Sequence, residues 1–237
     1  MVSKTKIDFL FYCPDIEKNR CLDLADSMHV AKVLRKKQGD IIQITDGVGG
    51  WYRCAVSDPN PKACKFEILE EQKEYNKAKR EIYIAICPTK NADRIEYFIE
   101  KSIEIGVSGI FFLKTQNTYP KKINNERFRK IAISAMKQSL KAYLPFLSEL
   151  ILFSDFLKKH SEFEQKVIAH LANDAEDIIS LDIKDKILVL IGPEGDFSTS
   201  EIQMAKESGF KNITLGQNRL RTETAGVLAA SILNLKL

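Results

Sequence analysis

Two different patterns of apolar positions divide the chain. Before residue 70 the apolar positions form short runs, at 41–44, 51–56 and 65–69, separated by Gly, Pro, Asn and Asp. Short strands joined by tight turns predict a small β-barrel. From residue 82 onwards, continuous apolar runs alternate with segments in which apolar residues recur at helical spacing. This alternation predicts an α/β fold with a mostly parallel sheet.

A charged stretch separates the two patterns. Residues 70–77 carry charges of both signs and show no period, which suits an exposed linker. We therefore predict two domains, residues 1–72 and residues 73–237.

The second pattern resolves into strands and helices. Strands are predicted at residues 82–86, 109–113, 166–171, 187–191 and 213–215. One helix has a buried stripe from Ile95 to Ile103 and stops at Gly106, and a second has a stripe from Phe128 to Ser139. A third helix, at 227–235, is apolar. The unbroken apolar run at 187–191 indicates a strand buried on both faces, as in a sheet covered by helices.

Two of these strands lead into loops that contain glycine. The turn GPEGD at residues 192–196 precedes a helix start at Ser198, and Glu201 completes a capping box. The second loop, at 216–221, is polar and cationic and precedes a helix that opens at Thr222. In open parallel sheets the ligand binds beyond the carboxyl ends of the strands. Both loops are therefore predicted to enclose one small ligand.

The sequence of these loops resembles a known family signature. IGPEGDFS at 191–198 and LGQNRLRTETA at 215–225 resemble the C-terminal motifs of the RsmE-type ribosomal RNA uridine-N3 methyltransferases, which belong to the SPOUT class. HVAKVLRKKQGD at 29–40 is similar to a motif of the PUA-like N-terminal domain of the same family. The resemblance therefore covers both halves of the chain.

The resemblance implies both the fold and the reaction. It implies a PUA-like RNA-binding β-barrel at 1–72 and a SPOUT methyltransferase domain at 73–237 with a C-terminal trefoil knot. It also implies a homodimer formed through the knotted domain. The expected reaction is S-adenosylmethionine-dependent methylation of N3 of a specific uridine in 16S ribosomal RNA, in an assembled or nearly assembled small subunit. The expected contacts to S-adenosylmethionine are His170, Leu171, Gly192, Pro193, Glu194, Gly195, Leu215, Gly216, Arg219, Leu220, Arg221 and Thr224.

Two residues of the second loop and helix are candidate catalytic groups. N3 of uridine must lose its proton before it can attack a methyl group, so the site must favour the anion or supply a base. Arg221 remains protonated and could stabilise negative charge on the uracil oxygens. Glu223 could accept the proton if burial raises its pKa, although a helix-capping or arginine-pairing role is an equal alternative. The reaction needs no metal.

The charge distribution favours RNA binding in the second part of the chain. The net charge is +4, yet residues 120–143 alone contain seven basic residues and one acid. A basic segment of this kind is either a solvated helix face or a surface that follows phosphates. Together with the PUA-like motif, it gives the expected RNA contacts: His29, Arg35, Lys36, Lys37, Lys121, Lys122, Arg129, Lys137, Gln138 and Lys141.

The chain departs from the family at three places. Asp196 stands where many relatives have glycine, so a positive φ there would be less comfortable, although aspartate tolerates it better than most residues. Residues 115–118, TQNT, lack the arginine of a Glu-Arg-Ser triplet found in many relatives. Lys141 replaces an arginine in a helical motif, and lysine grips phosphate less directionally.

Other function classes remain open or become less favoured. A SPOUT enzyme acting on a ribose 2′-hydroxyl or on transfer RNA, and a non-catalytic RNA-binding assembly factor, remain open. Nucleotide hydrolysis is disfavoured because no Gly-Lys-Ser/Thr follows the turn at 192–196. No apolar stretch approaches 18 residues, so we expect a cytoplasmic protein without membrane segments. The five cysteines form no Cys-x-x-Cys pair, so neither disulfides nor structural zinc are expected.

Overall fold

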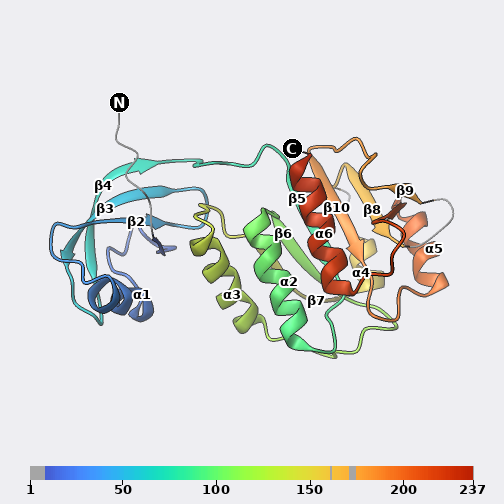
Figure 1. Ribbon diagram of the computed structural model, residues 1–237, viewed down its shortest axis with the longest axis horizontal. Helices are drawn as coiled ribbons and strands as arrows, with labels where there is room; N and C mark the ends of the chain where they lie inside the picture. The colour runs from blue at the N-terminus through green and yellow to red at the C-terminus, as the bar shows by residue number, and fades with distance from the viewer. Residues whose placement is uncertain (1–8, 161, 171–174, 237) are drawn as a thin grey trace. The chain divides into compact units, whose positions relative to one another are not determined.

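The chain forms two compact units. The computed structural model describes residues 9–160, 162–170 and 175–236. Unit 1 contains residues 1–77 and 133–144, and unit 2 contains the remaining residues (Figure 1). The sequence prediction had assigned residues 133–144 to the second domain. In the structure these residues contact unit 1, where Ala142 accepts hydrogen bonds from Gly49 N at 2.9 Å and from Thr45 Oγ1 at 3.1 Å. The predicted domain boundary stays a prediction.

Unit 1 is built on a four-stranded mixed sheet. Strand β1 runs parallel to β2, and the pairs β2–β3 and β3–β4 are antiparallel. A short helix α1 and a π-helical turn η1 complete the unit, whose core includes Phe11, Val30, Ile44 and Phe66. The sequence predicted a small PUA-like β-barrel here. The PUA-like domain is confirmed, and its strands form a four-stranded mixed sheet. Its elements are β1 (Leu10–Tyr12), α1 (Leu24–Met28), η1 (His29–Val33), β2 (Ile41–Thr45), β3 (Trp51–Asp58) and β4 (Lys65–Gln72).

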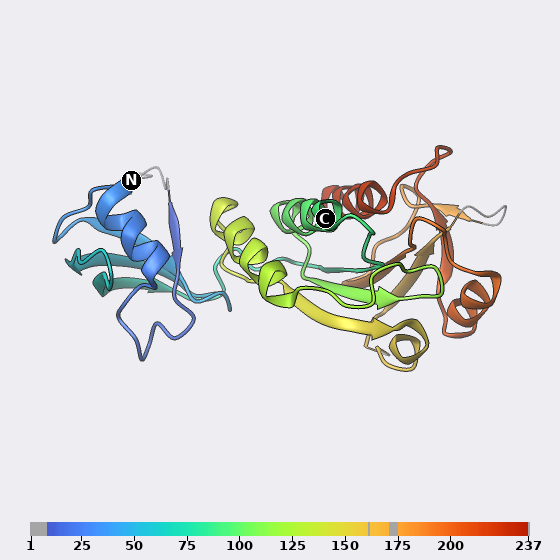
Figure 2. The same ribbon diagram turned by 90° about the horizontal axis from the view of Figure 1, so that it is seen from below.

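Unit 2 contains a seven-stranded sheet in which every pairing is parallel. The strand order is β7-β6-β5-β10-β8-β11-β9. Helices α2 and α6 cover one face of the sheet, and α4 and α5 cover the other (Figure 2). The strands are β5 (Glu81–Ile86), β6 (Gly109–Lys114), β7 (Phe146–Leu152), β8 (Gln165–Ala169), β9 (Glu176–Asp177), β10 (Lys186–Ile191) and β11 (Lys211–Thr214). The helices that follow them are α2 (Ala92–Ile105), α3 (Asn125–Gln138), α4 (Phe153–Leu157), α5 (Thr199–Glu207) and α6 (Thr222–Leu235), with α3 continuing into unit 1.

The buried strands of unit 2 agree with the sequence pattern. Ile84 on β5 and Leu188, Val189 and Leu190 on β10 are fully buried, as expected for strands covered on both faces. Gly106 ends α2 with a φ of +126°, a conformation that favours glycine. Because β10 lies between β5 and β8, its carboxyl end opens in the middle of the sheet, beside the ends of its neighbours. The trefoil knot stays a prediction.

None of the helices in the described part of the chain is long and apolar enough to cross a membrane.

Candidate functional site

The site is formed by two loops at the carboxyl edge of the sheet in unit 2. The first follows β10 and ends at Ser198, whose Oγ accepts a hydrogen bond from Glu201 N at 3.3 Å. Glu201 Oε2 accepts one from Ser198 N at 2.8 Å, so the predicted capping box is confirmed. The second loop follows β11 and leads into α6, which begins at Thr222 as predicted. Both helix starts are fixed next to the loops.

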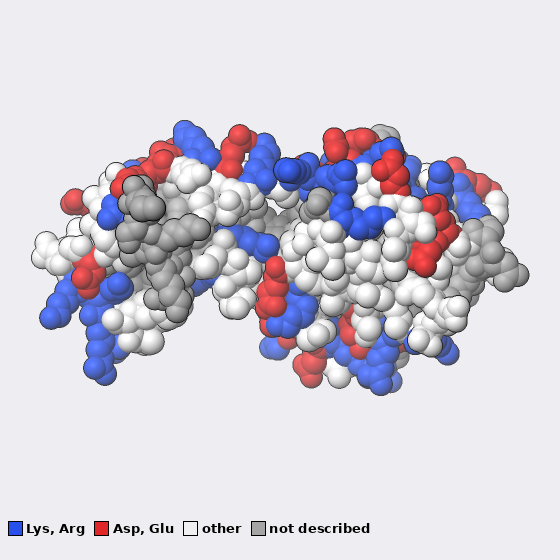
Figure 3. All heavy atoms as spheres, turned by 45° about the horizontal axis from the view of Figure 1, so that its top comes forward, with Lys and Arg blue, Asp and Glu red and all other residues white. Residues whose placement is uncertain are grey.

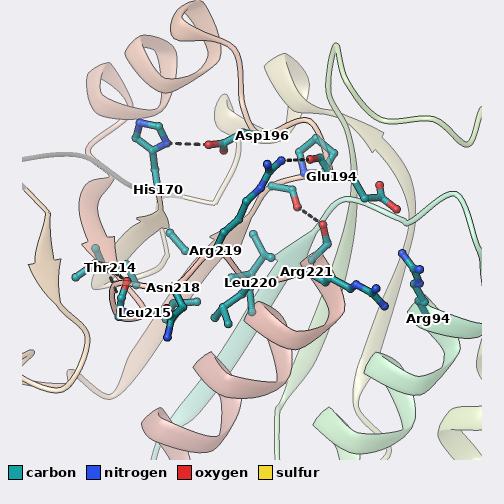
Figure 4. A pocket seen from close by; sticks show the side chains of 18 residues that line it. Arg94, His170, Glu194, Asp196, Thr214, Leu215, Asn218, Arg219, Leu220 and Arg221 are labelled. Carbon is teal, nitrogen blue, oxygen red and sulfur yellow. Dashed lines mark hydrogen bonds and ion pairs between the residues drawn. The ribbon is translucent and has the colours of Figure 1, made fainter.

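A cavity of about 480 Å³ lies between the two loops (Figure 4). Its walls come from the ends of β8, β10 and β11, from both loops, and from the first turns of α2 and α6. Its lining combines apolar and charged side chains, including three arginines and two carboxylates. The lining residues are Arg94, Ala169, His170, Ile191, Gly192, Pro193, Glu194, Asp196, Ile213, Thr214, Leu215, Gly216, Asn218, Arg219, Leu220, Arg221, Thr222 and Ala225.

Hydrogen bonds tie the two loops together across the cavity. Thr222 Oγ1 donates to the carbonyl oxygen of Gly192 at 3.0 Å. Arg219 Nη2 lies 3.4 Å from the carbonyl oxygen of Glu194, at the long end of a hydrogen bond (Figure 4). Gly216 adopts a φ of +110°, which is unfavourable for other residues, and a Cβ there would meet no atom within 4 Å. Glycine at this position therefore permits the loop conformation and leaves the space beside the cavity open.

Most of the predicted cofactor contacts line this cavity. They are His170, Gly192, Pro193, Glu194, Leu215, Gly216, Arg219, Leu220 and Arg221. Gly195 and Thr224 are not among the lining residues, and Leu171 lies outside the described residues. The sequence interpretation missed Arg94, which sits on the first turn of α2 after β5. The signal for Arg94 was its place shortly after β5. This strand is the sheet neighbour of β10, so the carboxyl ends of both strands open at the same edge.

Glu223 occupies a different place from the one proposed for a base. It does not line the cavity, and it is only 7% exposed. Its Oε1 lies 3.7 Å from Arg94 Nε, and its Oε2 is buried without a hydrogen-bond partner among the described residues. Arg94 and Arg221 both line the cavity, and Figure 4 shows their side chains extending toward the same side of it. The buried carboxylate is therefore the anionic partner of one of the two arginines.

Two of the three departures from the family meet at the first loop. Asp196 has a φ of +62°, and its Oδ1 accepts a hydrogen bond from Phe197 N at 2.7 Å, which supports this conformation locally. Its Oδ2 lies 3.3 Å from His170 Nδ1, although the two are not aligned for a hydrogen bond. Asn117 donates from Nδ2 to the carbonyl oxygens of Gly195 at 3.2 Å and Asp196 at 3.0 Å. Asn117, in the segment at 115–118 that departs from the family, thus stabilises the loop that contains Asp196.

The residues predicted to contact RNA differ in their exposure to solvent. Arg35, with a φ of +52°, and Lys37 are exposed, Lys36 is half-buried, and His29 packs edge-on against the rings of Phe9 and Phe11. In unit 2 the exposed candidates are Lys121, Lys122 and Arg129, and in unit 1 Gln138 is also exposed.

Two of the predicted contacts are held inside unit 1. Lys137 forms an ion pair with Asp26, which is 4% exposed. Lys141 is half-buried, and burial lowers the pKa of its ammonium group. On the face shown in Figure 3, basic and acidic side chains are interspersed over each unit. The basic segment at 120–143 is therefore only partly a solvent-facing cationic surface.

Both parts of the chain match known protein families. Residues 76–234 match the family described as RNA methyltransferase domain, and residues 23–69 match the family described as RNA methyltransferase PUA domain. The chain belongs to the RsmE family of RNA methyltransferases. The cavity thus lies in the methyltransferase domain of this family.

Relatives of known sequence and structure agree with the assignment. The ribosomal RNA small subunit methyltransferase E of Mesomycoplasma hyopneumoniae is 32% identical over 173 residues, covering 70% of this chain and 75% of the relative. A probable rRNA-methyltransferase from Porphyromonas gingivalis is 35% identical, with a TM-score of 0.90 over 96% of this chain and 99% of that chain. A ribosomal RNA small subunit methyltransferase E from Neisseria gonorrhoeae, solved with S-adenosyl methionine bound, is 26% identical, with a TM-score of 0.83 over 96% and 97% of the two chains.

Proposed function

We propose that the chain transfers a methyl group from S-adenosylmethionine to N3 of a uridine in small-subunit ribosomal RNA. The observation that carries the proposal is the cavity between the two loops, with two arginines on one side of it. Membership of the RsmE family supports the substrate class. The protein would act in the cytoplasm, where ribosomal RNA is assembled into subunits.

The cavity suits S-adenosylmethionine in size and chemistry. Its volume of about 480 Å³ lies within the usual range of small-molecule sites. Ile191, Leu215 and Leu220 offer apolar surface for an adenine ring, and the main chain of the loops offers donors and acceptors for its edge. The relatives from Neisseria gonorrhoeae and Legionella pneumophila were solved with this cofactor bound. We assign the residues of the two loops that line the cavity as its binding site.

The two arginines match the charge that the reaction develops. The cofactor supplies an electrophilic methyl group on a sulfonium. As the uridine loses its N3 proton to solvent water, negative charge spreads onto the flanking oxygens, and fixed cations at the site stabilise it. Arg221 is exposed at the cavity, and its guanidinium offers several N–H donors. We assign Arg221 as the principal group that binds the uracil anion and Arg94 as a second cation beside it.

Glu223 is proposed to orient Arg94. A general base must reach the proton directly or through one water, whereas the Glu223 carboxylate lies outside the cavity lining and faces Arg94. An ion pair at 3.7 Å restricts the guanidinium without consuming its charge. The arginine-pairing alternative therefore replaces the role of base in this proposal.

RNA binding is proposed for exposed basic residues of both units and for the exposed amide Gln138. These are Arg35 and Lys37, with half-buried Lys36 and His29 beside them in the PUA-like unit, and Lys121, Lys122, Arg129 and Gln138. Lys137 and Lys141 would contribute mainly through the stability of unit 1. A homodimer through a knotted unit 2, with α6 in the interface, completes the proposal.

Mass spectrometry of nucleosides tests the proposal directly. Small ribosomal subunits that lack the modification are incubated with the protein and S-adenosylmethionine, and their RNA is digested to nucleosides. We expect one 3-methyluridine per subunit. A 2′-O-methylated nucleoside, or methylation of transfer RNA in its place, would assign the chain to another RNA target, and no methylation of any RNA would favour a non-catalytic assembly factor.

A further inference from the structure

A second cavity of about 490 Å³ lies in unit 2, outside the site described above. It is enclosed by the loop that follows β5, the first two turns of α2, the loop before α3 and the start of α3. The two cavities share no lining residue. The lining residues are Pro88, Thr89, Lys90, Ala92, Asp93, Ile95, Glu96, Pro120, Lys122, Ile123, Asn124, Arg127 and Phe128.

The second cavity combines an apolar lining with cationic side chains. Ile95 and Phe128 are 2% and 4% exposed, and two prolines and Ile123 extend this surface. Arg127 is bound by both carboxylate oxygens of Glu96, so its charge is already balanced. Lys90 and Lys122 are exposed and have no acidic partner among the described residues. Lys90 Nζ instead lies 4.8 Å from the centre of the Tyr119 ring, which is 67% exposed.

The two cavities are separated by residues that contact one another. Lys90 N donates a hydrogen bond at 3.2 Å to Glu194 Oε1, and Glu194 lines the first cavity. On α2, Asp93 lines the second cavity and its neighbour Arg94 lines the first. The two cavities are therefore adjacent in unit 2.

We propose that the second cavity binds a nucleotide next to the methylated uridine in the same RNA strand. Its base would rest on the apolar lining and the adjacent Tyr119 ring, and its phosphate would lie between Lys90 and Lys122. Unstacked bases bind to apolar and aromatic surfaces, and phosphates to lysine, in the recognition of single-stranded RNA. This inference rests on the proposed function, because it requires that the substrate is RNA.

A pair of charge reversals tests this site. Lys122→Glu changes a residue that lines the cavity, and Lys130→Glu makes the same change at an exposed position on α3 that does not line it. Binding of a short single-stranded RNA that spans the target uridine is measured with both variants at several salt concentrations. We expect Lys122→Glu to weaken binding by about tenfold and to lower the salt dependence by roughly one counterion. Lys130→Glu should weaken it by no more than about twofold.

A charge-neutral variant and a crosslink separate the site from general electrostatics. Ile123→Trp fills the cavity without changing charge and should also weaken RNA binding. RNA with 4-thiouridine beside the target should crosslink to a peptide that contains residues 119–124. Equal effects of the two charge reversals, with normal binding by Ile123→Trp, would overturn the proposal. Unchanged S-adenosylmethionine affinity, measured by calorimetry, shows that each variant is folded.

The outcomes distinguish this inference from the proposed function. If the wild-type protein methylates uridine, the two charge reversals behave alike and Ile123→Trp binds RNA normally, only the second site fails. If the wild-type protein binds and crosslinks the RNA at 119–124 but methylates nothing, the second site stands and the proposed reaction fails.

Discussion

The loops around the first cavity and the basic residues predicted to bind RNA are held in different ways. The loops are fixed by hydrogen bonds such as Thr222 to Gly192 and Asn117 to Asp196. Arg35 and Lys37 are exposed side chains, and Lys137 is engaged by Asp26. A small rigid ligand suits the first kind of site, whereas a long polyanion suits the second. Mutations in the loops should therefore change catalysis or cofactor affinity, whereas mutations of the basic residues should change RNA binding or stability.

Arg221→Ala should give the largest effect and the sharpest separation of binding from chemistry. Loss of a cation that stabilises the developing uracil anion lowers kcat by about 10² to 10³ fold, by analogy with the loss of one oxyanion-hole donor. Affinity for S-adenosylmethionine should change little, because the loop main chain remains. A tritium-transfer assay and calorimetry measure the two quantities. Equal losses in both would show that Arg221 only holds the cofactor.

Lys137→Ala should act on stability and spare the chemistry. It leaves Asp26, which is 4% exposed, without its cationic partner, and breaking this partly buried pair costs on the order of 1–3 kcal/mol. Thermal unfolding should show a clear fall in Tm. The matched variant Lys130→Ala, on the same helix, should leave Tm within a degree or two. A normal Tm with weakened RNA binding would indicate that Lys137 contacts RNA.

Gly216→Ala should weaken cofactor binding by up to about tenfold. The residue has a φ of +110°, and alanine there costs on the order of 1–3 kcal/mol and shifts the loop. Gly39→Ala is the control, since Gly39 has a φ of +89° and is equally uncrowded, but lies in unit 1. Both variants should lose stability, and only Gly216→Ala should lose affinity in calorimetry. Equal affinity in the two would remove this loop from the cofactor site.

Asn117→Ala should have the smallest effect. It removes two hydrogen bonds to the first loop, which contribute about 1 kcal/mol each at most. We expect a few-fold loss of cofactor affinity that is partly relieved by Asp196→Gly, because glycine adopts the φ of +62° without strain. A double-mutant cycle on the dissociation constant measures this coupling. Strict additivity would show that the two departures from the family act independently.

The sequence predicted the first region well because its information is local. Continuous apolar runs predicted β5 and β10, and the capping box at Ser198 and the start of α6 at Thr222 followed from neighbouring residues. Arg94 was missed because it reaches the cavity from a helix about 100 residues earlier in the chain. It follows a predicted strand, but nothing in the sequence indicated that this strand pairs with β10.

Prediction was weaker where tertiary partners decide the role of a side chain. Lys137 and Lys141 have the helical spacing of surface lysines, but the first pairs with a residue 111 positions away and the second is half-buried. Residues 133–144 join unit 1 through hydrogen bonds to Thr45 and Gly49, and no periodicity encodes such contacts. Glu223 likewise carried no local sign that its partner would be Arg94.

The most direct test of the account is a calorimetric titration of the RNA-free protein with S-adenosylmethionine, with ATP as the comparison ligand. Because the cavity is formed by unit 2 alone, the account predicts one bound S-adenosylmethionine per chain without RNA and no saturable binding of ATP. Absence of S-adenosylmethionine binding at millimolar concentration, or preferential binding of ATP, would contradict it.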